Sequence, residues 1–433
     1  MAAAVRLVLV LTIILASWSA VEGGEYDFDI PEAEKSNLEF GGKVEFQLTH
    51  HQLDRDSLPY KLRFPEGGQD HWDEWRPFLE LNAGYNFGPA RVFLSVHNEY
   101  LKDDWDEDWT SRVYEGRLTI QPTPGAALEI GKKTFLWGKG YAWNPVGFIN
   151  RPKDPDDPEL NLEGYTGVSL DLIKSFQGGP LKTLAFTPVI LPVLDWENDD
   201  LGKQGEVNHA FKLYFLIEDV DLDLIYAGGP SRPDSLGFDF SANLKENLEV
   251  HGELAVVLDA DKTTVDAAGK KNTTKEDQVS WLFGLRYLSS LDTTYILEYY
   301  RNGAGYRPAE IDAFFKYQEA AYRQYLAKGQ VSALKEAAKT ASGYYSRRNY
   351  GLDYLYLKIS QKEPFDILYF TPYVAAMLNL GDSSLSLTPG FTYLPWTNFE
   401  FGWKIMVPVG RPGTEFGEKQ DAFQSKVTLA YYF

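Results

Sequence analysis

Apolar and polar side chains alternate, residue by residue, along most of the chain after position 37. This period of two is typical of strands that place one face in an apolar and the other in a polar environment. The alternating segments are residues 38–50, 75–87, 90–100, 111–121, 126–133, 163–176, 181–193, 206–218, 220–228, 234–243, 247–259, 277–289, 292–303, 347–361, 364–378, 383–394, 398–408 and 424–433. The pattern predicts about eighteen strands, with sixteen as the alternative.

The connections between these segments alternate in length. Short turns, such as residues 87–90, 121–126, 218–220 and 361–364, interleave with mostly longer connections. Short turns at one end and long loops at the other are typical of transmembrane antiparallel β-barrels, which have an even number of strands. We therefore predict an all-β barrel that begins at residue 38 and ends at residue 433.

The two faces of the predicted strands differ in chemistry. One face is nearly all apolar, as in Leu236, Phe238 and Phe240. The opposite face carries charges of both signs, which would cost roughly 2–4 kcal/mol each near the middle of a bilayer. A soluble β-sandwich also alternates, but it would have to bury many aromatic faces in a chain without cysteine. We therefore place the apolar face against lipid and the polar face in the lumen.

Composition and the N-terminal segment favour an exported protein. Residues 1–20 have one basic residue, a short apolar run and a small-residue end, which predicts a signal peptide rather than a membrane helix. Cleavage after Ser19, Ala20 or Gly23 is compatible with the pattern. Residues 21–37 are then a short periplasmic segment. The net charge of −20 makes nucleic acid an unfavourable partner.

The final ten residues, 424–433, alternate strictly and end on Phe433. This ending resembles the C-terminal signature strand of bacterial outer-membrane β-barrel proteins. The resemblance implies the outer membrane of a Gram-negative bacterium as the location and membrane lipid as the surroundings. It also implies that the barrel assembly machinery is a partner that reads Tyr431 and Phe433.

A long segment, residues 134–162, separates two predicted strands and is rich in Gly, Pro, Trp and charge. With the preceding strand it resembles the "strand, Trp-Gly, Asn-Pro" segment of porin-like proteins of proteobacteria. Its prolines exclude a helix, so it is either a constriction folded into the lumen or a rigid external cap. The predicted pore-lining residues are Lys133, Lys139, Arg151, Lys153, Asp154, Asp156 and Asp157, with Arg117, Glu129 and Arg286 deeper in the lumen.

The segment 304–346 changes to a helical period. Pro308 suits the first position of a helix, Gly329 suits its end, and a second helical run follows at residues 331–341. We predict an external helical insertion whose apolar stripe packs on the protein's own loops, closes the barrel mouth or binds a partner.

These observations predict a porin-like channel for passive passage of small polar solutes or ions, without catalytic residues, metal ion or cofactor. One alternative is a structural sleeve around a multihaem c-type cytochrome, because the chain has no haem attachment motif of its own. A less favoured alternative is a barrel enzyme, since no hydrolase or nucleotide-binding motif is present in the sequence.

Overall fold

The computed structural model describes residues 37–157, 162–344 and 349–433. The predicted signal peptide (1–20) and nearly all of the predicted periplasmic segment (21–37) lie outside these residues. Residues Leu38–Phe433 form a unit of their own. None of the described helices is long and apolar enough to cross a membrane.

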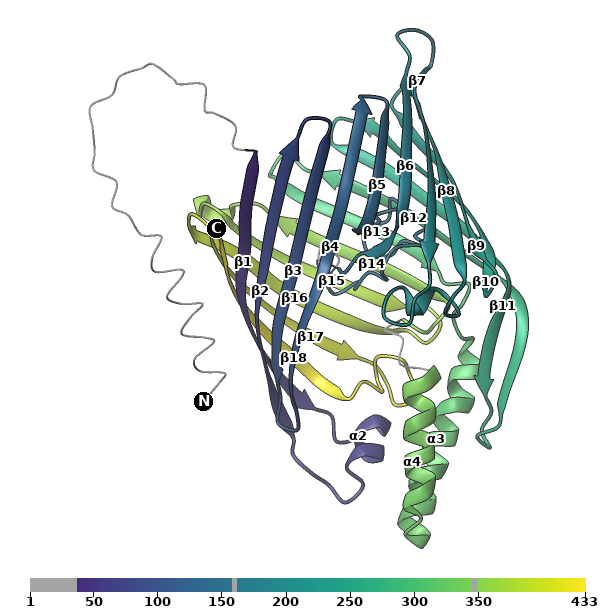
Figure 1. The fold of residues 1–433 in the computed structure, drawn as a ribbon. Coiled ribbons are helices and arrows are strands. Elements are labelled where there is room, and N and C mark those ends of the chain that lie inside the picture. Colours follow the sequence, from purple (N-terminus) through teal and green to yellow (C-terminus); the bar gives the residue numbers. More distant parts are fainter. Residues whose placement is uncertain (1–36, 158–161, 345–348) are drawn as a thin grey trace. The chain divides into compact units, whose positions relative to one another are not determined.

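The described residues form one sheet of eighteen antiparallel strands in which every strand pairs with the next in the sequence (Figure 1). The strands are β1 (Leu38–Leu53), β2 (His71–Phe87), β3 (Ala90–Lys102), β4 (Glu107–Thr123), β5 (Ala126–Lys133), β6 (Tyr165–Ser175), β7 (Leu181–Pro192), β8 (Val207–Ile217), β9 (Val220–Gly229), β10 (Arg232–Lys245), β11 (Leu248–Val265), β12 (Lys271–Leu288), β13 (Thr293–Arg301), β14 (Asp353–Gln361), β15 (Phe370–Asn379), β16 (Ser384–Trp396), β17 (Phe399–Val409) and β18 (Asp421–Tyr432).

Pairing of β1 with β18 closes the sheet into a barrel, so the predicted fold class and strand number are confirmed. At the seam Val44 lies opposite Tyr431. The backbones of Gly42 and Phe433 exchange two hydrogen bonds, of 2.9 and 3.1 Å. A closed sheet leaves no edge strand with unpaired N–H and C=O groups, which is why an apolar final strand is stable here.

The two ends of the barrel differ as predicted. Connections after even-numbered strands are short, whereas those after odd-numbered strands include the long ones, at residues 54–70, 134–164 and 302–352. We call these ends the short-turn end and the long-loop end.

The hairpin of β11 and β12 extends further than its alternation predicts. Their pairing continues from Ala260 with Glu276 to Val265 with Lys271. These outer residues are mostly polar on both faces, so apolar and polar positions do not alternate there and the pattern does not predict a strand. The strands are held there by backbone pairing and by a few side-chain contacts, such as that of Lys262 with Glu276.

The helices belong to loops at the long-loop end. They are α2 (Leu58–Arg63), α3 (Pro308–Lys328) and α4 (Val331–Tyr344), and a 3-10 turn at Asp199–Leu201 lies at the same end. A second 3-10 turn, Pro364–Asp366, follows β14 and lies at the short-turn end. Glu310 accepts the backbone N–H of Arg307 at 2.8 Å and so caps the start of α3, while Gly329 ends it with a φ of 64°. The short helix α2 is absent from the sequence prediction.

Helix α3 joins opposite sides of the barrel at the long-loop end. It packs against α2, which follows β1, and against β11, which lies ten strands further along the sheet. Leu58 of α2, Val265 of β11 and Phe314 of α3 share one buried apolar cluster. Lys262 of β11 pairs with Glu310 at 3.4 Å. The apolar stripe of the insertion therefore packs on the protein's own loops and across the barrel mouth.

Candidate functional site

The connection between β5 and β6, residues 134–164 and here called the inner loop, enters the barrel. Glu253, on the inner face of β11 and only 4% exposed, accepts the backbone N–H groups of Lys139 and Gly140, each at 2.6 Å. It also accepts the N–H of Val146 at 3.1 Å. Three backbone donors of the inner loop thus converge on one wall carboxylate.

A second wall carboxylate holds the next residues. Glu298 on β13 is fully buried and accepts the N–H of Ala142 at 2.8 Å and that of Tyr141. His251 Nε2 lies 2.8 Å from the same carboxylate. Charged acceptors form stronger hydrogen bonds than neutral ones, so these two glutamates fix the path of the inner loop.

Glycines allow the inner loop to approach Glu253. Gly138 has a φ of 99°, and a Cβ atom at that position would lie 2.8 Å from Glu253 Oε1. A Cβ atom on Gly140 would lie 2.0 Å from the carbonyl oxygen of Trp143. Gly138 is therefore required by its approach to the wall, and Gly140 by the close approach of the loop's own backbone.

Apolar contacts attach the inner loop to one side of the lumen. Trp137, Val146 and Ile149 pack with inward side chains of β6 to β11. Ala142 and Trp143 pack with side chains of β12 to β15 and with Phe416. The inner loop therefore fills the lumen along these strands and leaves open space on the remaining side.

The basic residues of the inner loop are tied into protein contacts. Lys139 Nζ lies 3.1 Å from Asp223, Arg151 lies 2.7 Å from Asp200, and Lys153 donates to the carbonyl oxygens of Gly140 and Tyr141. Burial lowers the pKa of Lys139, but Asp223 and Asp239 attract its charge and leave the pKa raised overall. Burial holds the pKa of Lys153 below its usual range.

The open side of the lumen contains two adjoining cavities, of about 630 Å³ and 350 Å³. The larger lies toward the long-loop end, where Phe416 and Lys419 line it, and the smaller extends toward Tyr432. The residues that line both are Lys43, Gln47, Phe78, Asp156, Asp157, Thr388, Lys404 and Lys426. These shared residues mark the neck between the cavities.

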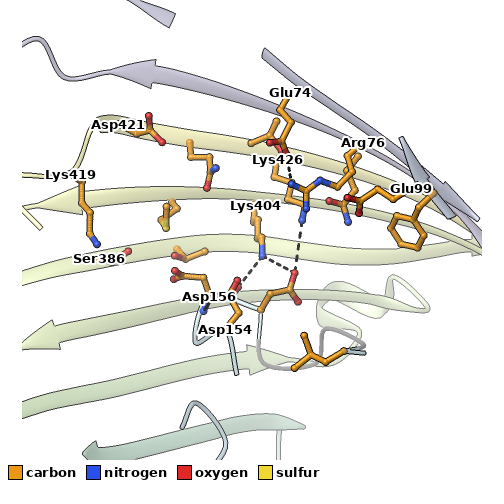
Figure 2. A pocket seen from close by; sticks show the side chains of 18 of the residues that line it. Glu74, Arg76, Glu99, Asp154, Asp156, Ser386, Lys404, Lys419, Asp421 and Lys426 are labelled. Atoms are coloured by element: carbon orange, nitrogen blue, oxygen red, sulfur yellow. Dashed lines mark hydrogen bonds and ion pairs between the residues drawn. The ribbon is translucent and has the colours of Figure 1, made fainter. Parts of the chain in front are cut away.

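Opposite charges face each other at the neck. Lys404 Nζ lies 2.9 Å from the carbonyl oxygen of Asp156 and 3.3 Å from a carboxylate oxygen of Asp157, and Lys426 lies 4.0 Å from Asp157. Figure 2 shows Lys404 and Lys426 on the wall strands, beside Arg76 and facing the inner loop. A wall rich in basic residues and an acidic loop tip thus border the same passage.

The structure separates the predicted pore-lining residues into two groups. Asp154, Asp156 and Asp157 line the larger cavity. The other predicted residues do not line either of the two cavities, and they are Lys133, Lys139, Arg151, Lys153, Arg117, Glu129 and Arg286.

Among this second group, the wall residues Arg117, Glu129 and Lys133 pair with one another on β4 and β5. Arg286 lies on β12 opposite Glu249.

Sequence reasoning assigned no role to four groups that shape the site. Glu253, Lys404 and Lys426 stand out in the sequence only as charges on the lumen face. Arg76, 3.1 Å from Glu74, is not singled out at all. For Glu253, the alternating pattern indicates only that the carboxylate faces the lumen. It does not indicate that Glu253 binds backbone N–H groups of a distant loop.

Comparison with solved structures gives fold neighbours. OccK11 (OpdR) of Pseudomonas aeruginosa aligns with a TM-score of 0.52 and 11% identity, over 92% of this chain and 96% of that one. OccK5 (OpdH) of the same organism aligns with a TM-score of 0.51 and 11% identity, over 91% and 98% of the two chains. A variant of the Rhodopseudomonas blastica porin aligns at a TM-score of 0.45. No family model and no curated protein matches the sequence. The chain therefore shares its barrel fold with the two Pseudomonas aeruginosa proteins.

Proposed function

We propose that this protein is a passive outer-membrane channel for small polar solutes or ions. The observation that carries the proposal is the pair of adjoining cavities beside the inner loop, which meet at the neck where the tip of this loop contacts Lys404. The apolar outward face, with Leu254 and Phe283 about half exposed, supports insertion of the barrel into lipid.

Selectivity would arise from size and from the electric field at the neck. Lys43, Lys404 and Lys426 border one side and Asp156 and Asp157 the other. In a narrow space of low dielectric constant these charges act on a passing solute more strongly than they would in bulk water. A polar or charged solute can exchange water contacts for these side chains, whereas an apolar solute cannot.

The helical pair at the long-loop end adds a second control on access. Helix α3 crosses from the β1 side to the β11 side of the barrel mouth, so a solute must pass around it. We propose that the α3–α4 pair acts as a partial lid that limits the size of entering solutes.

Conductance of the purified protein in a planar bilayer tests the channel function. Discrete single-channel steps that depend on the salt concentration are expected. A variant in which residues 139–157 are replaced by a short Gly-Ser linker should show larger steps, because the inner loop is removed from the lumen. Absence of any conductance from correctly folded protein, in both forms, would contradict the proposal.

The cytochrome sleeve is the second candidate. A sleeve requires a lumen wide enough for a protein, but the inner loop is fixed inside the lumen by Glu253 and Glu298. The contacts of the inner loop therefore favour passage of small solutes.

A further inference from the structure

Three carboxylates form one row behind the inner loop. Asp223 on β9 lies opposite Asp239 on β10, and Asp239 lies opposite Glu253 on β11. Directly opposite residues on neighbouring antiparallel strands have Cβ atoms about 4.5–5.5 Å apart. The three acidic side chains are therefore immediate neighbours on the inner face of the barrel.

Two lysines face this row from the inner loop and from β8. Lys139 Nζ lies 3.1 Å from Asp223 Oδ2 and 3.9 Å from Asp239 Oδ1, and Lys212 Nζ lies 4.0 Å from Asp223 Oδ1. Glu253 is already satisfied by the N–H groups of the inner loop. Next along β9, Asp221 accepts the hydroxyl of Tyr214.

Three oxygen atoms in the row have no hydrogen-bond donor among the described residues. They are Asp223 Oδ1 and both carboxyl oxygens of Asp239. Asp223 is 1% exposed and Asp239 is fully buried. Each buried acceptor left without a donor costs about 1–3 kcal/mol, and an ionised one costs more. The unpaired oxygens belong to two directly opposed side chains.

We propose that Asp223 and Asp239 share one proton, which one carboxyl donates to the other through an O–H···O hydrogen bond. The shared proton supplies a donor at the place where the donor is missing. It also leaves the pair with a single negative charge, which together with Glu253 balances Lys139 and Lys212. Without the proton, two negative charges would lie side by side in a buried site. Their repulsion and the loss of hydration make ionisation of both carboxyl groups strongly unfavourable.

A bound metal ion explains the row less well. The described residues contain no group of three or more acidic, His or Cys side chains arranged to hold a metal ion. The ammonium group of Lys139 already occupies the space beside Asp223.

The shared proton makes the inner loop sensitive to pH. Lys139 belongs to the inner loop and is anchored by its side chain to Asp223 and by its N–H to Glu253. Alkaline pH removes the proton and leaves one negative charge in excess next to this anchor, so the loop and its buried neighbours must rearrange or admit a cation. Strong acid protonates both carboxyls and weakens the hold on Lys139. The effect on conductance rests on the channel function proposed above, whereas the shared proton does not.

Asp239→Asn tests the inference, because an asparagine supplies an N–H donor to Asp223 without needing a proton. Asp221→Asn is the matched control. It removes a carboxylate from the same face of β9, but this carboxylate accepts a hydrogen bond from Tyr214 and is not part of the proposed pair. Infrared difference spectra of the three proteins at about pH 7 report a protonated carboxyl group directly. Conductance is then followed from about pH 6 to about pH 10, a range that brackets titration of such a pair.

The wild type and Asp221→Asn should show a protonated carboxyl band at about pH 7 that disappears reversibly at alkaline pH, whereas Asp239→Asn should lack it. Conductance of the first two proteins should change with the band, and that of Asp239→Asn should stay flat. A wild-type spectrum without the band, or one in which Asp239→Asn keeps it, overturns the shared proton. An intact band without any conductance in the wild type would instead contradict the channel function alone.

Discussion

His251 and Glu298 lie 2.8 Å apart on adjoining regions of the inner wall, and the same Glu298 carboxylate holds the inner loop through the N–H groups of Tyr141 and Ala142. The wall therefore supplies a charged, buried hydrogen-bond acceptor for the backbone of a loop that is far away in the sequence. A second wall carboxylate, Glu253, holds the same loop through the N–H groups of Lys139, Gly140 and Val146.

Replacing Glu253 by leucine should release the inner loop. The change leaves the N–H groups of Lys139, Gly140 and Val146 without acceptors, at about 1–3 kcal/mol for each unpaired donor. We expect a lower thermal unfolding midpoint in detergent and noisier single-channel currents. Glu249→Leu, on the same face of β11 and more exposed, is the matched control. Equal current noise in the two variants would show that Glu253 does not position the loop.

Neutralising Asp154, Asp156 and Asp157 together should shift ion preference toward anions. The triple Asn variant leaves Lys404 and Lys426 uncompensated at the neck. The interaction energy between a single charge and an ion about 8 Å away is about 2 kcal/mol at an effective dielectric constant near 20. Reversal potentials in a salt gradient measure the shift, which should shrink at high salt because of screening.

Lys404→Gln should move the reversal potential in the opposite direction, since it removes a cation from the same passage. Arg151→Gln is the control, because Arg151 pairs with Asp200 and does not line either cavity. A response to Arg151→Gln as large as that to Lys404→Gln would place the selective charges elsewhere.

Glu415 should make the stability of the long-loop end depend on pH. It is fully buried, accepts Tyr354 Oη and Asn379 Nδ2, each at 2.6 Å, and burial raises its pKa above the ordinary value of 4.5. The folded protein then holds the proton more tightly than the unfolded chain. This contribution to stability is complete below pH 4.5 and is lost as the pH rises through the higher folded pKa.

Glu415→Gln cannot ionise, so it should raise the unfolding midpoint relative to wild type at about pH 7. The difference should shrink as the pH falls below 4.5, where the wild-type carboxyl is protonated in both states. Unfolding curves of the two proteins across this range provide the measurement. A difference that grows on acidification would show that the folded protein does not hold the Glu415 proton more tightly than the unfolded chain.

Lys262→Ala should weaken the attachment of the α3–α4 pair to the barrel. Lys262 is 7% exposed and lies 3.4 Å from both Glu276 and Glu310, so it fastens α3 to the β11–β12 hairpin. We expect faster amide hydrogen exchange in α3 and a higher rate of solute uptake into proteoliposomes. Lys316→Ala, in an exposed pair with Asp312 on α3, serves as the control and should change neither quantity.

Much of the fold follows from local pattern, but the site does not. Alternation and turn chemistry locate eighteen strands, because each strand shows its two environments within its own residues. The contact of Glu253 with Gly140 depends on how a loop folds back onto a strand, and no local period records it. The helix α2 was missed because six residues are too short to show a helical period.

The predicted basic residues of the inner loop illustrate the same limit. Their charge suggested that Lys139, Arg151 and Lys153 face the passage, yet each has partners within the protein. Side-chain direction in an irregular loop is set by tertiary contacts, so the sequence identified a charged loop without showing which charges a solute meets.

The seam between Gly42 and Phe433 has a kinetic consequence. Pairing the first strand with the last joins residues at nearly the greatest separation that the chain allows, and such contacts form slowly because the loop they close is long. Until that step, β1 and β18 each present an unpaired edge that can join another chain. The rate at which the seam closes, compared with the rate of aggregation, should therefore decide the yield of refolded protein.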